Sequence, residues 1–473
     1  MSCESNNATA PSAAIAPGGE GINPLEVARR VREMGGVDQR LPAIVPGFDA
    51  PFFQAGLAGY SDAAMRLIAR RHGCPYCVTE ALLDRTLLAG GRGFAKADLG
   101  ELHDNVPGGA GDHPLAGQIM GSDPEEMAAA ALKMIEQGAR TEREYRRLAY
   151  RGRLGPGDNR PAETLRQPGG EVIEWVVCGE DEDELGREDG ATEDTPIVCD
   201  SSTQTRSRGG EAVRSFEVID VNLACPVKKI ASKARGGHWL AEPEGAIRIL
   251  KAVRDALPAS VACTVKLRRS FDDTPEMAAN FERILIAVRD LGYAWATVHG
   301  RTVRQKYVGP SRWDVLRDIV RRHEGFPILG SGDVWSAGDI FRMIGYAGVA
   351  AVSVARGCIG NPWIFRQARQ ILAGERATNP TLEEQRGVLE EHFELLLAVN
   401  RGMRHGEEAS SRMIRKFGIR FAAHHPEVES VRKAMIAVES HADWRRMLET
   451  HYAGGGHGEP GIDRVETTTV KPA

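Results

Sequence analysis

The sequence predicts a (β/α)8 TIM barrel followed by an all-helical domain, and the alternation of two patterns is the reason. From about residue 50 onward, short apolar runs alternate with amphipathic stretches, and continuous apolar runs are typical of parallel strands buried on both faces. Eight such units favour a closed barrel over an open doubly wound sheet, which is the alternative. The eight runs are Phe52–Gly56, Cys77–Thr79, Ala116–Met120, Val218–Asn222, Ala262–Leu267, Ala296–His299, Pro327–Gly330 and Ala351–Val354.

Helices are expected between most of these strands. Asp123 followed by Pro124 forms a favourable N-cap and first-turn pair for a helix over Glu125–Gln137. Amphipathic stretches of similar length predict further helices at Asp62–Arg71, Pro243–Ala256, Met277–Leu291, Trp313–Arg322 and Ala337–Ile344.

Two polar segments interrupt this regular pattern. The N-terminal residues are rich in Ala, Pro, Gly and Asn, which predicts a flexible tail with a short helix near Leu25–Met34. A polar, Gly-rich insertion includes the acidic run Glu180–Glu184, so we expect it to lie at the surface and away from any polyanion. The expected organisation is a tail at 1–40, a barrel domain at 41–372 with its insertion at 140–212, a helical domain at 373–453 and a flexible tail at 454–473.

The helical domain combines an apolar face with many basic residues. Thr381 and Glu384 have the spacing of a capping box, and Leu389, Phe393 and Leu396 then follow on one face of the helix. A solvated helical cap and a nucleic-acid platform both fit this composition. The basic residues are Arg401, Arg404, Arg412, Arg415, Lys416, Arg420, Arg432, Lys433, Arg445 and Arg446.

Composition indicates a globular protein in a reducing compartment. Hydrophobic residues make up 42% of the chain and charged residues 26%, which is ordinary for a globular protein. The net charge of −5 is mild, but nucleic-acid binding depends on a local patch rather than on this average. Eight scattered cysteines do not suggest a disulfide framework, and neither a membrane-length apolar run nor a secretory signal is visible. We therefore expect a cytoplasmic protein without membrane association.

Candidate functional residues lie where the predicted strands end, because the carboxyl ends of barrel strands form the active face. The ends of strands seven and eight, at Gly330–Asp333 and Ala355–Gly357, have the glycine-rich pattern of a phosphate site, to which Arg356 would add charge. Gln118 and Lys266 could form hydrogen bonds with the polar edge of a flavin ring. Cationic side chains pointing into a barrel, such as Lys266, are costly without an anionic partner.

Several of these stretches, in this order, resemble the motifs of the tRNA-dihydrouridine synthases. The resemblance covers about residues 51–139 and 215–372, and more weakly the helical domain. Because several motifs occur in order, the resemblance is specific, whereas any single one would be weak. The motifs are Asp220–Lys229, which contains Asn222 and Cys225, then Thr264–Arg268, His299–Thr302 followed by Tyr307 and Gly309–Pro310, and Arg356–Trp363.

The resemblance implies FMN as cofactor, NADPH as reductant and a uridine of tRNA as substrate. It implies that Cys225 is the general acid and that Asn222 and Arg268 line the substrate pocket. No metal is expected, and we expect a monomer. The implied FMN contacts are Gly56, Leu57, Ala58, Gln118, Lys266, His299, Ser331, Gly332, Asp333, Ala355 and Arg356.

The chain departs from the family pattern at four positions. Gly56 stands where proline is usual, Ala224 and Ala355 replace glycines, and Ser331 replaces asparagine. All four residues are small or polar, so the pocket should persist with altered hydrogen bonds.

Two other functions and one other motif fit parts of the sequence. A flavin oxidoreductase acting on free pyrimidines, like dihydroorotate or dihydropyrimidine dehydrogenases, would not need a basic helical domain. A non-catalytic RNA-binding barrel would not need Cys225, Lys266 and His299 together. The single pair Cys74 and Cys77 has CxxC spacing, but without a second pair it favours a structural role.

Overall fold

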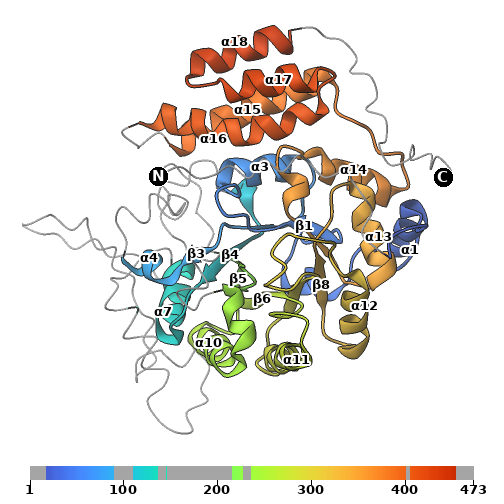
Figure 1. Cartoon of the computed structure of the whole chain (residues 1–473), viewed down its shortest axis with the longest axis vertical. Helices are drawn as coiled ribbons and strands as arrows, with labels where there is room; N and C mark the ends of the chain where they lie inside the picture. The colour runs from blue at the N-terminus through green and yellow to red at the C-terminus, as the bar shows by residue number, and fades with distance from the viewer. Residues whose placement is uncertain are drawn as a thin grey trace, which may run out of the picture.

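A closed barrel of parallel strands forms the centre of the molecule (Figure 1). The computed structural model describes residues 18–89, 110–136, 145, 216–226, 236–400 and 405–453. Neighbouring strands pair in the order β2-β1-β9-β8-β7-β6-β5-β4-β3, and a further pairing of β2 with β4 closes the ring. The predicted barrel is thereby confirmed. The strands are β1 Phe52–Gln54, β2 Cys77–Val78, β3 Leu82–Leu83, β4 Leu115–Met120, β5 Val218–Leu223, β6 Ala262–Arg268, β7 Trp295–His299, β8 Ile328–Ser331 and β9 Val352–Val354.

The second position of the barrel is shared by two short strands. Both β2 and β3 pair with β4, with Cys77 opposite Leu115 and Leu82 opposite Ile119. Between them, the hydroxyl of Thr79 accepts a hydrogen bond from the backbone N–H of Gln118 at 3.0 Å. The nine strands of the described part of the chain therefore fill eight barrel positions. The sequence pattern predicted β2 and missed β3.

Helices surround the barrel close to where the sequence placed them. The structure has α10 at Pro243–Ala256 and α12 at Trp313–Arg322, the bounds that the periodicity predicts. Ser336 forms a capping box with Asp339 at the start of α13. The other elements are α2 Arg40–Ile44, α3 Ala63–Arg71, α4 Asp84–Ala89, η1 Ala110–Asp112, α7 Pro124–Ile135, η3 Gly236–Ala241, α11 Pro275–Asp290, α13 Ala337–Ala347, η4 Arg356–Cys358 and α14 Trp363–Ala373.

The short helix expected near the N-terminus is present, but it is not part of a loose tail. Helix α1, Pro24–Glu33, is capped by the side chain of Asn23 and lies against α13 and α14 (Figure 1). Its Val27 and Ala28 are buried in the same core as the barrel helices. Residues 18–40 therefore belong to the barrel's outer layer, which corrects the boundary drawn from composition. Residues 1–17, most of the 140–212 insertion and residues 454–473 lie outside the described residues.

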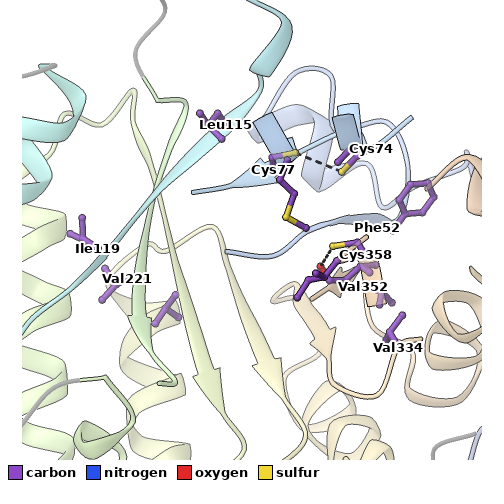
Figure 2. Packing of buried hydrophobic residues seen from close by; sticks show 14 of the residues in the cluster. Phe52, Cys74, Cys77, Leu115, Ile119, Val221, Val334, Val352 and Cys358 are labelled. Carbon is purple, nitrogen blue, oxygen red and sulfur yellow. Dashed lines mark hydrogen bonds between the residues drawn. The ribbon is translucent and has the colours of Figure 1, made fainter. Parts of the chain in front are cut away.

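The main core lies between the strands and the surrounding helices. Figure 2 shows Phe52, Leu115, Ile119, Val221 and Val352 on the strands within this cluster. Cys74 and Cys77 belong to the same cluster, with their sulfur atoms 3.9 Å apart (Figure 2). This placement in a packed core agrees with the structural interpretation of the pair.

A second, smaller core seals the amino-terminal end of the barrel. Leu41 and Phe48 pack against inward-facing Phe53, Tyr76 and Trp295, and the rings of Phe48 and Tyr76 stack with centroids 4.9 Å apart. Polar side chains occupy the barrel interior nearer the carboxyl ends of the strands, including Gln118, Asp220 and Thr264. The interior is thus closed by aromatic rings at one end and polar at the other.

Beyond the barrel, four α-helices form a separate layer over α3 and α14 (Figure 1). The ring of Tyr60, in the loop after β1, contacts Phe417 edge-on at 5.6 Å. The indole of Trp363 contacts both Phe421 and His424. The helical domain is therefore fixed to the barrel by aromatic packing. Its elements are α15 Leu382–Val399, α16 Gly406–Phe421, η5 Ala422–His424, α17 Val428–Ile436 and α18 His441–His451.

No helix in the described part of the chain combines the length and apolarity needed to span a membrane.

Candidate active site

The parallel register brings most of the predicted site residues to one end of the barrel. Asn222 on β5 lies opposite Lys266 on β6, and Arg268 lies opposite His299 on β7. His299 in turn lies opposite Ser331 on β8. Because all strands run in the same direction, these side chains share the carboxyl-terminal mouth of the barrel.

Lys266 places a cation inside this mouth. Its ammonium group makes no hydrogen bond or ion pair with any residue that the structure describes, although the side chain is only partly exposed. Burial lowers the pKa of Lys266 to about 8, the nearby Arg268 acts in the same direction, and Asp220 opposes both. A cation held in this way is suited to an anionic or strongly polar ligand.

Arg268 is largely engaged in holding two loops. Its Nε donates to the carbonyl of Ala224 at 3.0 Å, and its Nη1 donates to the carbonyls of Thr302 and Lys306. Among the described residues its Nη2 has no hydrogen-bond partner, so this nitrogen is left to donate to a ligand. Burial is the main reason why the pKa of Arg268 is lowered to about 10. Its proposed place in the substrate pocket stays a prediction.

A chain of hydrogen bonds links the polar interior to the loop after β5. Asp220 accepts from the hydroxyl of Thr264 at 2.6 Å and from Nε2 of Gln118 at 2.7 Å. Oε1 of Gln118 accepts from Nδ2 of Asn222 at 2.8 Å, and Oδ1 of Asn222 accepts from the backbone N–H of Ala224 at 3.0 Å. Burial raises the pKa of Asp220, and these hydrogen bonds and Lys266 partly offset the increase.

Cys225 follows directly on this chain and is partly exposed. Its carbonyl accepts a hydrogen bond from the backbone N–H of Gly237 at 3.0 Å. Cys225 follows the end of β5 by two residues, and Arg268 ends β6, which pairs with β5, so the two lie at the same end of the barrel. Cys225 therefore lies on the same rim as the cationic residues of the mouth. Residues 227–235, which complete the loop, lie outside the described residues.

The ends of β7 and β8 form a second, more charged part of the site. His299 is surrounded by cations: burial lowers its pKa well below the usual range, and Lys266, Arg268, Arg301 and Arg356 reinforce this effect. The imidazole is therefore neutral, and its Nδ1 is buried without a hydrogen-bond partner. A side chain at Gly332 would come within 2.8 Å of His299 Nε2, and Gly332 has a φ of 110°, so only glycine fits there.

Asp333 and Arg356 have different surroundings at this end of the mouth. Asp333, with φ of 55°, accepts from Nη2 of Arg301 at 2.7 Å and from the backbone N–H of Ser311 at 2.7 Å. Arg356 makes no hydrogen bond or ion pair with the described residues and instead lies against two aromatic rings, Tyr307 and Trp335, each at 4.9 Å. Arg356 is therefore the more available cation for an anionic group.

The loop after β1 lies close to the same interior. A Cβ atom at Gly56 would come within 2.3 Å of the Thr79 carbonyl oxygen and 3.1 Å of Gln118 Oε1, so a larger residue would clash with the backbone here. The backbone N–H of Leu57 already donates to the hydroxyl of Ser61 at 2.8 Å, and Ala58 is exposed. Ala355, at the end of β9, directly precedes Arg356. Roles for Leu57, Ala58 and Ala355 stay predictions.

Three residues of the site were not assigned from the sequence, although each lies inside a quoted motif. Arg301 pairs with Asp333, Tyr307 lies between two arginines, and Asp220 anchors the interior hydrogen bonds. The signal for Arg301 was its position two residues after His299 at a strand end. The loop contacts of Tyr307 depend on folding and left no comparable signal.

Fold and site together define a (β/α)8 barrel whose mouth holds cationic side chains beside a partly exposed thiol. The sequence model of the dihydrouridine synthase (Dus) family matches residues 207–451, more than half of the chain. The chain therefore belongs to the dihydrouridine synthase family. In the parts of the chain that can be described, no group of three or more His, Cys, Asp or Glu residues is placed to hold a metal ion.

Individual relatives agree with this family. The chain is 35% identical over 173 residues to a probable tRNA-dihydrouridine synthase of Treponema pallidum, covering 35% of this chain and 50% of the relative. It is 31% identical over 225 residues to a probable tRNA-dihydrouridine synthase of Mycobacterium tuberculosis, covering 47% and 56%. It is 30% identical over 262 residues to tRNA-dihydrouridine synthase B of Xanthomonas axonopodis pv. citri, covering 54% and 76%. The chain thus spans about half the length of the first two curated relatives.

Proposed function

We propose that the protein reduces the C5–C6 double bond of a uridine in tRNA to 5,6-dihydrouridine. The observation that carries this proposal is the placement of the Cys225 thiol and the Lys266 ammonium at the same barrel mouth, in a chain of the dihydrouridine synthase family. Family membership supplies the reaction class. The mouth supplies a proton source and a cation for it.

The donor set of the mouth fits a flavin with a phosphate tail, and we propose FMN. At one end, Lys266 and Gln118 offer hydrogen-bond donors to the polar edge of a ring. At the other end, Arg356 and the backbone N–H of Gly332 could donate hydrogen bonds to a phosphate. The buried, unpartnered Nδ1 of His299 lies between them and is suited to a further polar contact. The remaining contacts would come from the loop after β1, from Ser331 and Asp333, and from Ala355.

We propose that different residues of the chain deliver the proton to the base and stabilise the charge that builds on it. A reduced flavin bound in the mouth would supply the hydride for C6. Cys225 would deliver the proton to C5, which requires its thiol to be protonated when the base arrives. Lys266 and the spare Nη2 of Arg268 would stabilise negative charge that builds on the uracil carbonyls. Asn222 borders the same pocket through its position beside Ala224.

A stacked uracil cannot reach this mouth, so the base has to be extruded from the RNA. We propose that the helical domain at 373–453 holds the RNA by its phosphates. Arg412, Lys416 and Arg420 lie four residues apart on α16, are exposed, and make no ion pair with the described residues. Arg420 is close enough to Arg356 to lower the pKa of that guanidinium. We propose that these α16 cations, together with Arg356, are the contacts for the RNA phosphates.

Four further points stay predictions from the sequence. These are NADPH as the reductant, a cytoplasmic location, a monomeric state and the domain boundaries other than the corrected one at residue 40.

Replacing the thiol tests the proposal directly. In Cys225→Ala, oxidation of the reduced enzyme by unmodified tRNA in a single turnover should slow by about 10²–10⁴-fold, the usual contribution of a general acid. Cys263→Ala is the matched control, because Cys263 is buried on β6 and its sulfur accepts a hydrogen bond from Arg254. A Cys225→Ala rate equal to that of the control would remove Cys225 from the acid role.

The substrate class needs a separate comparison. The protein should act on unmodified tRNA and leave free uracil and dihydroorotate unchanged. Turnover of a free pyrimidine at a comparable rate would favour the alternative of a small-molecule flavin oxidoreductase. A purified full-length protein without flavin absorbance would instead favour a non-catalytic role.

A further inference from the structure

The hydrogen-bond chain beneath the mouth has a fixed direction. A carboxylate can only accept hydrogen bonds, so Asp220 forces Gln118 to turn its Nε2 toward it at 2.7 Å. Gln118 must then turn its Oε1 toward Asn222, which donates from Nδ2 at 2.8 Å. Asn222 is left with Oδ1 facing the backbone N–H of Ala224, where it accepts at 3.0 Å. One buried charge thus sets the orientation of two side-chain amides.

This chain ends one residue before the thiol. The N–H of Ala224 is held by Asn222, and the carbonyl of Ala224 is held by Nε of Arg268 at 3.0 Å. Both polar groups of Ala224 are therefore fixed, and the backbone of Cys225 starts from a defined position. We propose that Asp220 is a positioning residue that holds the Cys225 thiol over the mouth through Gln118 and Asn222. This inference rests on the function proposed above.

A purely electrostatic role for Asp220 does not explain the same contacts. Asp220 and Lys266 form no ion pair within 4.0 Å among the described residues, whereas both Asp220 oxygens are engaged by neutral donors, Thr264 and Gln118. With only 5% of its surface exposed, the carboxylate depends on these two donors. The contact that leads onward to the thiol is the one with Gln118.

The direction of the chain gives a sharp test. In Asp220→Asn, an amide replaces the carboxylate; because an amide offers a donor as well as an acceptor, it no longer dictates which end of Gln118 faces it, and the direction of the chain is no longer fixed. In the double variant Asp220→Asn with Gln118→Glu, the new carboxylate at 118 can accept from both neighbours, so Asn222 regains its native orientation. The double variant therefore restores the direction of the chain without restoring the original residues.

The reactivity of Cys225 toward iodoacetamide, followed by peptide mass spectrometry on the full chain, reports the position of the thiol. Losing one hydrogen bond that holds the loop should raise the alkylation rate of Cys225 about fivefold in Asp220→Asn. The double variant should return the rate to that of the native protein. Should Asp220→Asn fail to fold, Gln118→Leu interrupts the same chain and should give the same increase.

Two controls separate positioning from general loosening. Asp112→Asn breaks the buried pair with Arg66, and neither residue is part of the Asp220 hydrogen-bond chain. This variant should therefore lower the melting temperature and leave Cys225 alkylation unchanged. Thr264→Val removes only the other hydrogen bond to Asp220 and should have little effect on the thiol.

The inference is overturned if Asp220→Asn leaves the alkylation rate unchanged, if the double variant fails to restore it, or if Asp112→Asn raises it equally. Alkylation needs neither cofactor nor RNA. Failure of this positioning role is therefore distinguishable from failure of Cys225 as the acid, which the single-turnover experiment measures.

Discussion

The guanidinium of Arg356 lies 4.9 Å from the centre of the Tyr307 ring. The guanidinium of Arg268 lies 5.5 Å from the same ring, so one aromatic side chain connects two cations from opposite parts of the barrel mouth. Tyr307 is nevertheless 56% exposed and followed by Val308, which is 77% exposed. The loop between β7 and α12 therefore presents exposed apolar side chains beside both arginines.

Removing the Tyr307 ring should weaken activity by releasing both arginines. Each cation–π contact at an exposed site contributes about 0.5–1 kcal/mol, so Tyr307→Leu should lower the single-turnover rate on tRNA roughly tenfold. Tyr307→Phe keeps the ring and should retain most of the rate. If the phenylalanine variant is as slow as the leucine variant, the hydroxyl rather than the ring contact is responsible.

The pH dependence of turnover should reveal Lys266. Its pKa of about 8 means that the ammonium is present below this pH and is lost as the pH rises through it. Because the cation is proposed to stabilise charge on uracil, the single-turnover rate should fall above about pH 8. Lys266→Met should be about 100-fold slower, as expected for loss of one such donor, and should lack this alkaline decrease. A decrease that persists in Lys266→Met would assign it to another group.

Acid should destabilise the contact between the barrel and the helical domain. Burial lowers the pKa of His392 to about 3, and it lowers the pKa of both His72 and His424 to about 4. An unfolded histidine titrates near 6.5, so the unfolded chain binds more protons below that pH, and stability is lost as the pH falls from about 6.5 toward 4. His392→Phe should reduce the fall in melting temperature between pH 7 and pH 5. Parallel profiles for the variant and the native protein would exclude His392 as a contributor.

A buried ion pair should be sensitive to the loss of one partner. Arg66 and Asp112 are both almost fully buried and joined at 2.7 Å, so Asp112→Asn removes a charged partner from a guanidinium in the core. Such a change costs about 3–5 kcal/mol, which urea unfolding would measure. The double variant Arg66→Met with Asp112→Leu should be much closer to the native stability. A single-variant cost below about 1 kcal/mol would contradict this account.

The repeating parts of the fold could be predicted because period and burial leave a local signal. Apolar runs located all eight barrel positions, and the helices Pro243–Ala256 and Trp313–Arg322 have their predicted bounds. The two-residue strand β3, Leu82–Leu83, was missed because it shares one barrel position with β2 and therefore adds no further unit to the alternation. The helix α1 was predicted near its observed position, but composition assigned it to a flexible tail, because its packing on α13 and α14 depends on two buried side chains, Val27 and Ala28.

The site could be predicted as a set of strand ends, but the contacts of its side chains could not. Register explains why Asn222, Lys266 and His299 come together. By contrast, the engagement of Arg268 by three carbonyls depends on the paths of loops far along the chain. The same holds for Asp220, whose partners come from β4 and β6.

The loop that follows β1 contributes to two places at once. Gly56 closes on Gln118 in the barrel interior, while Tyr60, four residues later, packs on Phe417 of α16. A ligand that orders this loop from inside the barrel therefore also favours one placement of the basic helix outside it. Thermodynamic linkage then requires that a ligand in the barrel and a ligand proposed to bind on α16 alter each other's affinity by the same factor.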